Sequence, residues 1–123
     1  MSIADDASTA GRLLRALRAL IHAADKLPKP TTVKIPEPPD LELETVNRPR
    51  DAFFSEYQDV DANDAVGRIA AEQITPYPPG IPVIVPGERI TQPLVDYLLT
   101  GLQAGMALPD PADPSLKTIR VMQ

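Results

Sequence analysis

The first regular pattern in the chain is a helical repeat of apolar residues close to its start. They recur three and four positions apart, which predicts an amphipathic helix from about Thr9 to Lys26. Asp5 and Asp6 can cap this helix, and Pro28 ends it. We expect its apolar stripe to join the core of this domain or of a neighbouring one. The stripe consists of Leu13, Leu14, Leu17, Leu20, Ile21 and Ala24, while Arg12, Arg15 and Arg18 lie on the more polar side.

A second helix is predicted from about Asp64 to Gln73. Asp61 or Asn63 would cap it, and Gly67 would let another backbone come close. Asp59, Asp61 and Asn63 also resemble the start of a calcium loop, but the glycine and the terminal glutamate that such a loop needs are missing. We therefore assign these residues to the helix cap. The inward side chains of this helix would be Val66, Ile69 and Ala70.

A third helix is predicted to begin after Thr91, with Pro93 in its first turn. Gly105 is a suitable residue to end it, because glycine readily adopts the left-handed conformation beyond a helix C-terminus. The apolar face of this helix comprises Leu94, Val95, Leu98, Leu99, Leu102 and Met106.

Strands are predicted from alternation and from β-branched residues. Thr118–Met122 alternates and predicts a final strand, and Ile81–Val85 predicts a short β-branched one. Thr31–Ile35 and Leu41–Val46 are two further candidates, for which strand and irregular structure remain equal alternatives. Together these elements predict an α+β domain, a small sheet with about three helices packed on it.

The composition limits how the core can be built. Hydrophobic residues make up 43% of the 123 residues, but aromatic residues only 4%, and tryptophan is absent. The core must therefore consist mainly of Leu, Ile, Val and Ala. Phe53 and Phe54 are the only phenylalanines in the sequence, and we expect them to anchor it.

Charge and cysteine content exclude several classes of protein. The formal net charge of −5 disfavours nucleic acid or an anionic membrane as a partner and mildly favours cationic ligands. The absence of cysteine excludes a disulfide framework and a thiolate metal site. The sequence has no apolar run of transmembrane length and no basic signal-peptide start, so we expect a cytoplasmic location.

The proline-rich stretch from Thr75 to Glu88 is the most conformationally constrained segment of the sequence. Proline fixes φ and restricts the residue before it, so Thr75–Pro82 is predicted to be stiff and extended. Pro86-Gly87 then closes it with a turn. A segment this constrained loses little entropy on ordering, so it suits a loop held against another surface.

Four motifs follow one another along the chain: residues 50–54 (RDAFF), 65–72 (AVGRIAAE), 77–88 (YPPGIPVIVPGE) and 113–121 (DPSLKTIRV). In this order they resemble the C-terminal domain of the Orn/Lys/Arg decarboxylases, pyridoxal-phosphate enzymes that remove CO2 from basic amino acids. Ile3-Ala4-Asp5-Asp6 and the helix after it resemble the last strand and helix that precede this domain in full-length members. The resemblance implies a preceding helix over 1–27, a proline-rich linker over 28–49 and the C-terminal domain over 50–123.

The resemblance also implies which parts of the enzyme are missing. Family members hold pyridoxal phosphate on a lysine as a Schiff base, in a large domain N-terminal to the residues present here. None of the four lysines, Lys26, Lys29, Lys34 and Lys117, follows a Ser-x-His pattern, and the single histidine, His22, lies within the first helix. We assign no catalytic, cofactor-binding or metal residue to this chain. Pyridoxal phosphate would belong to the full-length enzyme.

The candidate site residues are Tyr77, Pro79, Gly80 and Glu88, at an active-site entrance or a domain interface. Local packing of Tyr77 is an equal alternative. Glu88 could equally cap the third helix or be solvated. A carboxylate of Glu72 or Glu88 could attract a cationic side chain.

Two hypotheses about function follow. In the first, the chain is the C-terminal domain of a decarboxylase of arginine, lysine or ornithine. It would support assembly and the active-site entrance, pack on the catalytic domains, form a homodimer or larger oligomer when full-length, and be inactive alone. In the second, it is a stand-alone interaction or regulatory module derived from that domain. A small enzyme that uses Glu72 or Glu88 as acid or base is disfavoured, because the sequence identifies no pocket for it.

Overall fold

The computed structural model describes residues 6–29 and 31–123, which fall into two compact units, Met1–Pro30 and Thr31–Gln123. The strand suggested by Ile3-Ala4-Asp5-Asp6 has its first three residues outside the described ones. Among the described residues, no helix is both long and apolar enough to cross a membrane.

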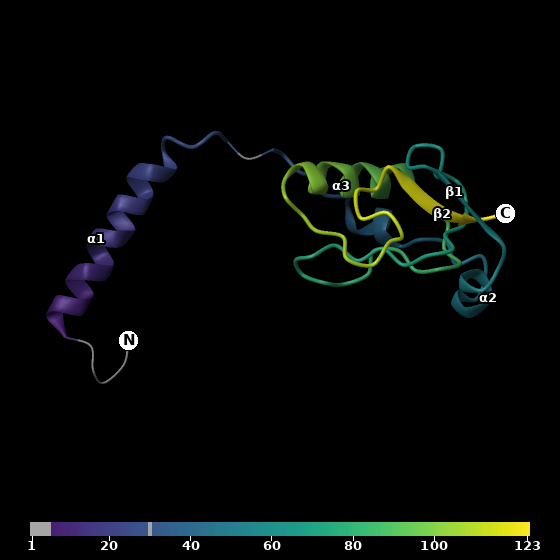
Figure 1. Ribbon diagram of the computed structural model, residues 1–123, viewed down its shortest axis with the longest axis horizontal. Coiled ribbons are helices and arrows are strands. Elements are labelled where there is room, and N and C mark those ends of the chain that lie inside the picture. Colours follow the sequence, from purple (N-terminus) through teal and green to yellow (C-terminus); the bar gives the residue numbers. More distant parts are fainter. Residues whose placement is uncertain (1–5, 30) are drawn as a thin grey trace. The chain divides into compact units, whose positions relative to one another are not determined.

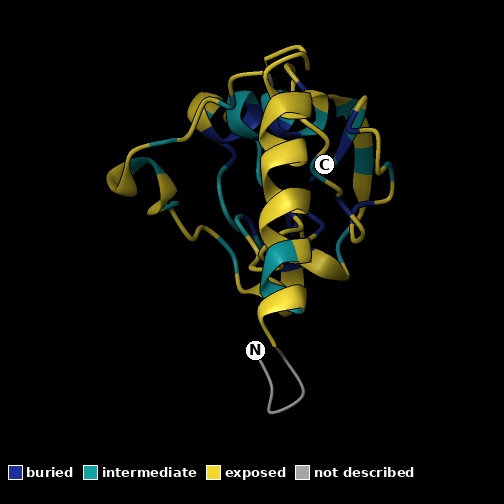
Figure 2. Cartoon of the chain, turned by 90° about the vertical axis from the view of Figure 1, so that its left-hand side faces the viewer, coloured by how far each residue is buried: buried dark blue, intermediate teal, exposed yellow. Residues whose placement is uncertain are grey.

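The first unit contains the helix α1, Ala7–Ala24, and confirms the predicted amphipathic helix (Figure 1). Asp6 caps it: its side chain accepts hydrogen bonds from the backbone N–H groups of Ser8 and Thr9, while the hydroxyl of Thr9 accepts one from the N–H of Asp6. The large apolar side chains of the stripe are 46–65% exposed, and most of α1 is exposed in Figure 2. Within its own unit the stripe is therefore uncovered: Leu13, Leu14, Leu17, Leu20 and Ile21.

The second unit is α+β, as predicted. Two five-residue strands, β1 (Tyr57–Asp61) and β2 (Thr118–Met122), pair antiparallel, with Val60 opposite Ile119 (Figure 1). The helical elements of this unit are the 3-10 helix η1 and the α-helices α2 and α3. Their bounds are Pro38–Leu41, Pro49–Phe53 and Gln92–Gln103.

The core of the second unit is aliphatic, as the composition predicts. Side chains from α3 and from the inner face of β2 meet in it, among them Leu94, Leu98, Ile119 and Val121. The role predicted for the two phenylalanines is wrong, because Phe53 is 57% and Phe54 77% exposed. In the short helix α2 the fully buried residue is Ala52.

The prediction of a helix at Asp64–Gln73 is wrong, although the apolar residues there have helical spacing. Gly67 has a φ of +83°, which interrupts helical geometry, and its N–H bonds to the carbonyl of Ile90. Beyond it, Ile69 and Ala70 form isolated bridges with segments far away in the sequence. Long-range backbone pairing replaces local helix bonds here. Asp61 consequently caps a turn, accepting a hydrogen bond from the N–H of Asn63 at 3.0 Å.

The third predicted helix is confirmed as α3. Thr91 occupies its N-cap position, but the Thr91 side chain makes no cap hydrogen bond. Gly105 follows the helix with a φ of +94°, the conformation expected after a C-terminus.

Of the four predicted strands, only Thr118–Met122 is confirmed in full, as β2. Ile81–Val85 contributes a single bridge, Ile84 to Ile74, and Leu41–Val46 contributes one at Thr45. Thr31–Ile35 is not a strand. It lies along α3 instead, where the N–H of Lys34 donates to the hydroxyl of Thr100 at 3.0 Å.

Candidate interaction site: the proline-rich loop

The proline-rich loop, residues 75–82, folds back on itself and is not extended as predicted. The N–H of Gly80 donates to the carbonyl of Pro76 at 2.8 Å, and Gly80 has a φ of +85°. Both the Tyr77–Pro78 and the Pro78–Pro79 peptide bonds are cis. The turn that the Gly80 hydrogen bond closes gives the loop a tip, residues 77–82, and a base formed by the residues on either side.

The base of the loop is fixed by backbone hydrogen bonds on both sides. Tyr77 donates its N–H to the carbonyl of Ala107 at 2.8 Å and accepts the N–H of Ala107 at 3.1 Å. Ile74 pairs with Ile84 in the same way as a strand residue, and both side chains are buried. Because these contacts reach the core, the loop is a firmly anchored part of the domain.

The tip of the loop is exposed and uncharged. Tyr77 is 61% and Ile81 65% exposed, and the residues between them are exposed as well. The sequence from 73 to 87 contains no ionisable residue other than Tyr77. An exposed tyrosine and isoleucine on a fixed base are typical of a surface that binds a partner. The sequence had assigned Ile81 to a strand and so missed it as a site residue, although the following Pro82 argues against a central strand.

Glu88 is not part of this tip. Its carboxylate accepts a hydrogen bond from the N–H of Val85 at 2.9 Å and so stabilises the turn at Pro86-Gly87. Glu88 thus closes this turn instead of capping α3. Gly87 is the position where two backbones approach closely, because a Cβ there would collide with the carbonyl oxygen of Asn47.

Glu72 also has a structural role. It is only 7% exposed, and its two carboxylate oxygens accept the N–H groups of Ala112 and Arg120, each at 2.7 Å. These bonds connect Glu72 to two backbone positions that lie 40 and 48 residues further along the chain. A carboxylate used in this way is poorly placed to serve as an acid or base for a substrate.

The metal-binding and charged residues considered from the sequence can also be placed within the described part of the chain. No group of three His, Cys, Asp or Glu side chains there is close enough to hold a metal ion. Asp59 of the rejected calcium loop pairs with Arg120 at 3.1 Å, and the Arg120 guanidinium lies 3.9 Å above the ring of Tyr57. His22 lies in the last turn of α1.

Comparison with known protein families identifies the family of this chain. The family model described as the Orn/Lys/Arg decarboxylase C-terminal domain matches residues 36–110, which include α2, β1, the proline-rich loop and α3. The chain therefore belongs to this family.

Several of the relatives that the chain matches are named arginine or lysine decarboxylases. The chain is 45% identical to an arginine decarboxylase of Bacillus anthracis over 91 residues, which are 74% of this chain and 18% of that protein. It is 37% identical to an arginine decarboxylase of Bacillus subtilis (strain 168) over 122 residues, or 97% of this chain and 24% of the relative. The chain thus spans about a fifth of the length of these relatives.

A solved structure supports the fold. The Francisella novicida lysine decarboxylase LdcF superimposes with a TM-score of 0.57 and 29% identity, over 66% of this chain and 14% of that one. The constitutive lysine decarboxylase of Escherichia coli gives the same TM-score at 24% identity.

Proposed function

We propose that this chain is the C-terminal domain of a pyridoxal-phosphate decarboxylase of a basic amino acid, that it supports assembly and the active-site entrance, and that it is inactive alone. The observation that carries the proposal is the uncharged tip at Tyr77–Pro82, exposed on a base that the core holds in place. In the complete enzyme this tip would contact the catalytic domains. The apolar stripe of α1 also supports the proposal, because nothing in its own unit covers it and an apolar surface of this kind is typical of a protein–protein contact.

The surface hollow that Lys34 lines does not suit pyridoxal phosphate. The ammonium group of Lys34 is paired with Asp96 at 2.7 Å. Glu37 and Asp40 line the same hollow, and their charge would repel a phosphate. We propose that the cofactor is held by catalytic domains outside this chain, and that the chain by itself releases no CO2 from amino acids.

Arginine is the first substrate to test for the parent enzyme. The arginine decarboxylases match 71–97% of this chain, whereas a lysine decarboxylase of Escherichia coli K12 matches 42% of it. We further propose that the complete enzyme is a cytoplasmic homodimer or larger oligomer that supplies amines for polyamine metabolism. The proposed domain boundaries remain 1–27, 28–49 and 50–123.

A hybrid enzyme tests this proposal. The matching C-terminal region of the Bacillus subtilis arginine decarboxylase is replaced by this chain, and the hybrid is compared with the parent and with the truncated parent. We expect the truncated enzyme to lose assembly and arginine decarboxylation, and the hybrid to recover both. Full activity and assembly of the truncated enzyme would contradict the proposed role. So would release of CO2 by the 123-residue chain alone when pyridoxal phosphate and arginine, lysine or ornithine are supplied.

A further inference from the structure

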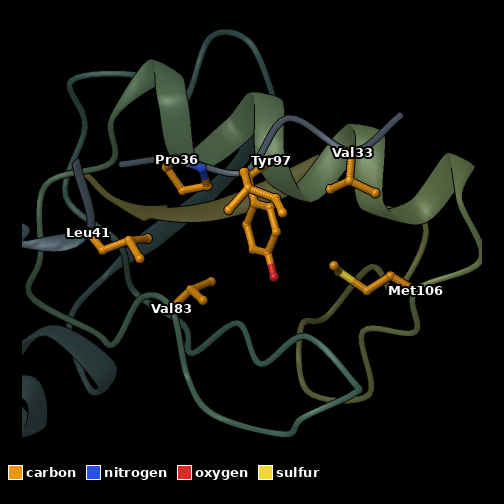
Figure 3. A pocket seen from close by; sticks show the side chains of 7 residues that line it. Val33, Pro36, Leu41, Val83, Tyr97 and Met106 are labelled. Carbon is orange, nitrogen blue, oxygen red and sulfur yellow. The ribbon is translucent and has the colours of Figure 1, made fainter. Parts of the chain in front are cut away.

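An apolar hollow lies beside α3, separate from the tip of the proline-rich loop. Its volume is about 320 Å³, at the lower end of the roughly 300–1,000 Å³ typical of small-molecule pockets. Residues 33–41 form one wall, α3 another, and residues 83 and 106 the rest (Figure 3). The residues that line it are Val33, Ile35, Pro36, Leu41, Val83, Tyr97 and Met106.

The lining gives this hollow a definite chemistry. It contains no charged side chain, and its one polar side chain is Tyr97. Figure 3 shows the Tyr97 hydroxyl pointing into the open space between Val83 and Met106. A charged ligand would lose its hydration here without gaining a partner, whereas a neutral one could bond to this hydroxyl.

The walls are fixed by contacts that do not involve the hollow itself. Lys34 fastens the first wall to α3 through its N–H bond to Thr100 and its ion pair with Asp96. The N–H of Val83 donates to the carbonyl of Ile74 at 3.0 Å, and that of Met106 to the carbonyl of Gly101 at 2.9 Å. A hollow held open in this way does not have to be ordered by its ligand, which lowers the cost of binding.

We propose that this hollow is a binding site for a small, neutral, mainly apolar molecule with one polar group that hydrogen-bonds to the Tyr97 hydroxyl. Indole suits the test, because it is uncharged and carries a single N–H donor. Indene has nearly the same shape without that donor, so it is the matched probe.

The test is a titration of the 123-residue chain with each probe, followed through the NMR signals of the methyl groups of Val33, Val83 and Met106. We expect both probes to shift these signals, with indole binding about five-fold more tightly, as one hydrogen bond of about 1 kcal/mol implies. Tyr97→Phe removes only the hydroxyl and should abolish the preference for indole. Tyr57→Phe, which changes a tyrosine outside the hollow, should leave the preference intact.

A second variant, Val83→Trp, fills the hollow and should abolish binding of both probes while the chain remains folded by NMR. The proposal is overturned if neither probe shifts the methyl signals of the wild-type chain. The hollow would then be better explained as a contact for a side chain of another protein. The proposal is also overturned if a folded Val83→Trp chain binds as well as wild type, or if Tyr97→Phe keeps the preference for indole. None of these outcomes depends on whether the chain belongs to an active decarboxylase.

Discussion

Tyr77 and Ala107 are joined by two backbone hydrogen bonds, at 2.8 and 3.1 Å, so the residue at the start of the loop tip is fixed to the segment that follows α3. The Tyr77 side chain nevertheless faces solvent. A residue with a fixed backbone and an exposed aromatic ring offers a partner a contact surface that loses little entropy on binding.

Replacing Tyr77 separates docking from stability. We expect Tyr77→Ala to change the free energy of unfolding by less than about 0.5 kcal/mol, because its backbone bonds remain and its ring is exposed. In the hybrid enzyme the same change should weaken assembly by about 2 kcal/mol, or roughly 30-fold, as loss of a central aromatic contact does. Analytical ultracentrifugation of the hybrid measures this. Tyr57→Ala is the matched control, and equal effects of the two substitutions on assembly would contradict the role given to Tyr77.

Replacing Glu72 tests how much its two buried hydrogen bonds contribute to the stability of the fold. Glu72→Gln keeps the size of the side chain but replaces one acceptor oxygen with an NH2 group, which would face the N–H of Ala112 or Arg120. We expect a loss of about 1–3 kcal/mol in the free energy of unfolding, measured by urea denaturation. Glu42→Gln changes an exposed carboxylate and should cost less than about 0.5 kcal/mol. A Glu72→Gln chain as stable as wild type would show that the two hydrogen bonds contribute nothing.

Two glycines with positive φ should respond differently to alanine. A Cβ added at Gly67 would meet no atom within 4 Å, so Gly67→Ala should cost only the roughly 1–2 kcal/mol of a left-handed residue. Gly87→Ala adds a collision with the carbonyl oxygen of Asn47 and should cost clearly more. Thermal unfolding of the two variants compares them directly. The reverse order would mean that the Gly87 backbone does not approach Asn47 as described.

Asp113 makes the stability of the chain depend on pH. Its carboxylate accepts hydrogen bonds from the Ser115 hydroxyl and from the N–H groups of Ser115, Lys117 and Thr118. These bonds, with the Ser115 hydroxyl contributing most, hold the pKa of Asp113 below its usual 3.8. A lowered pKa in the folded state means that the stabilisation is present above the unfolded pKa and is lost as the pH falls through the folded one.

The stability of the wild-type chain relative to Asp113→Asn should therefore be constant between about pH 6 and 8 and fall below about pH 4. Urea denaturation across this range measures the difference, and NMR titration of the Asp113 carboxyl carbon should give a midpoint below 3.8. A midpoint above 3.8, or a difference that grows on acidification, would contradict the assignment.

The sequence predicted those elements whose signals are local. The spacing of apolar residues within α1, α3 and β2 predicts each of these elements. Pro28 after α1, Pro93 in the first turn of α3 and Gly105 after α3 mark the helix ends. Residues 64–73 carry a helical pattern as well, but their long-range backbone partners are residues 87–90 and 120–122. Pairing between segments so far apart leaves no periodic signal in either of them.

The same distinction applies to the site. Tyr77, Pro79 and Gly80 were identified through the proline-rich sequence, and the structure places all three at an exposed tip. Glu88 was set beside them by its position in the chain, yet its carboxylate is used by the turn at Val85. The exposure of Phe53 and Phe54 could not be anticipated, since burial depends on which face of a five-residue helix meets the core.

Covalent footprinting of Tyr77 tests the central claim most directly, because it reports whether the loop tip is covered in an assembled enzyme. Hydroxyl-radical labelling of Tyr77 is measured in the 123-residue chain and in the hybrid with the Bacillus subtilis arginine decarboxylase. The account predicts strong labelling in the chain alone, where Tyr77 is 61% exposed, and a several-fold decrease in the hybrid. Equal labelling of Tyr77 in an assembled, active hybrid would contradict the claim that this loop docks on the catalytic domains.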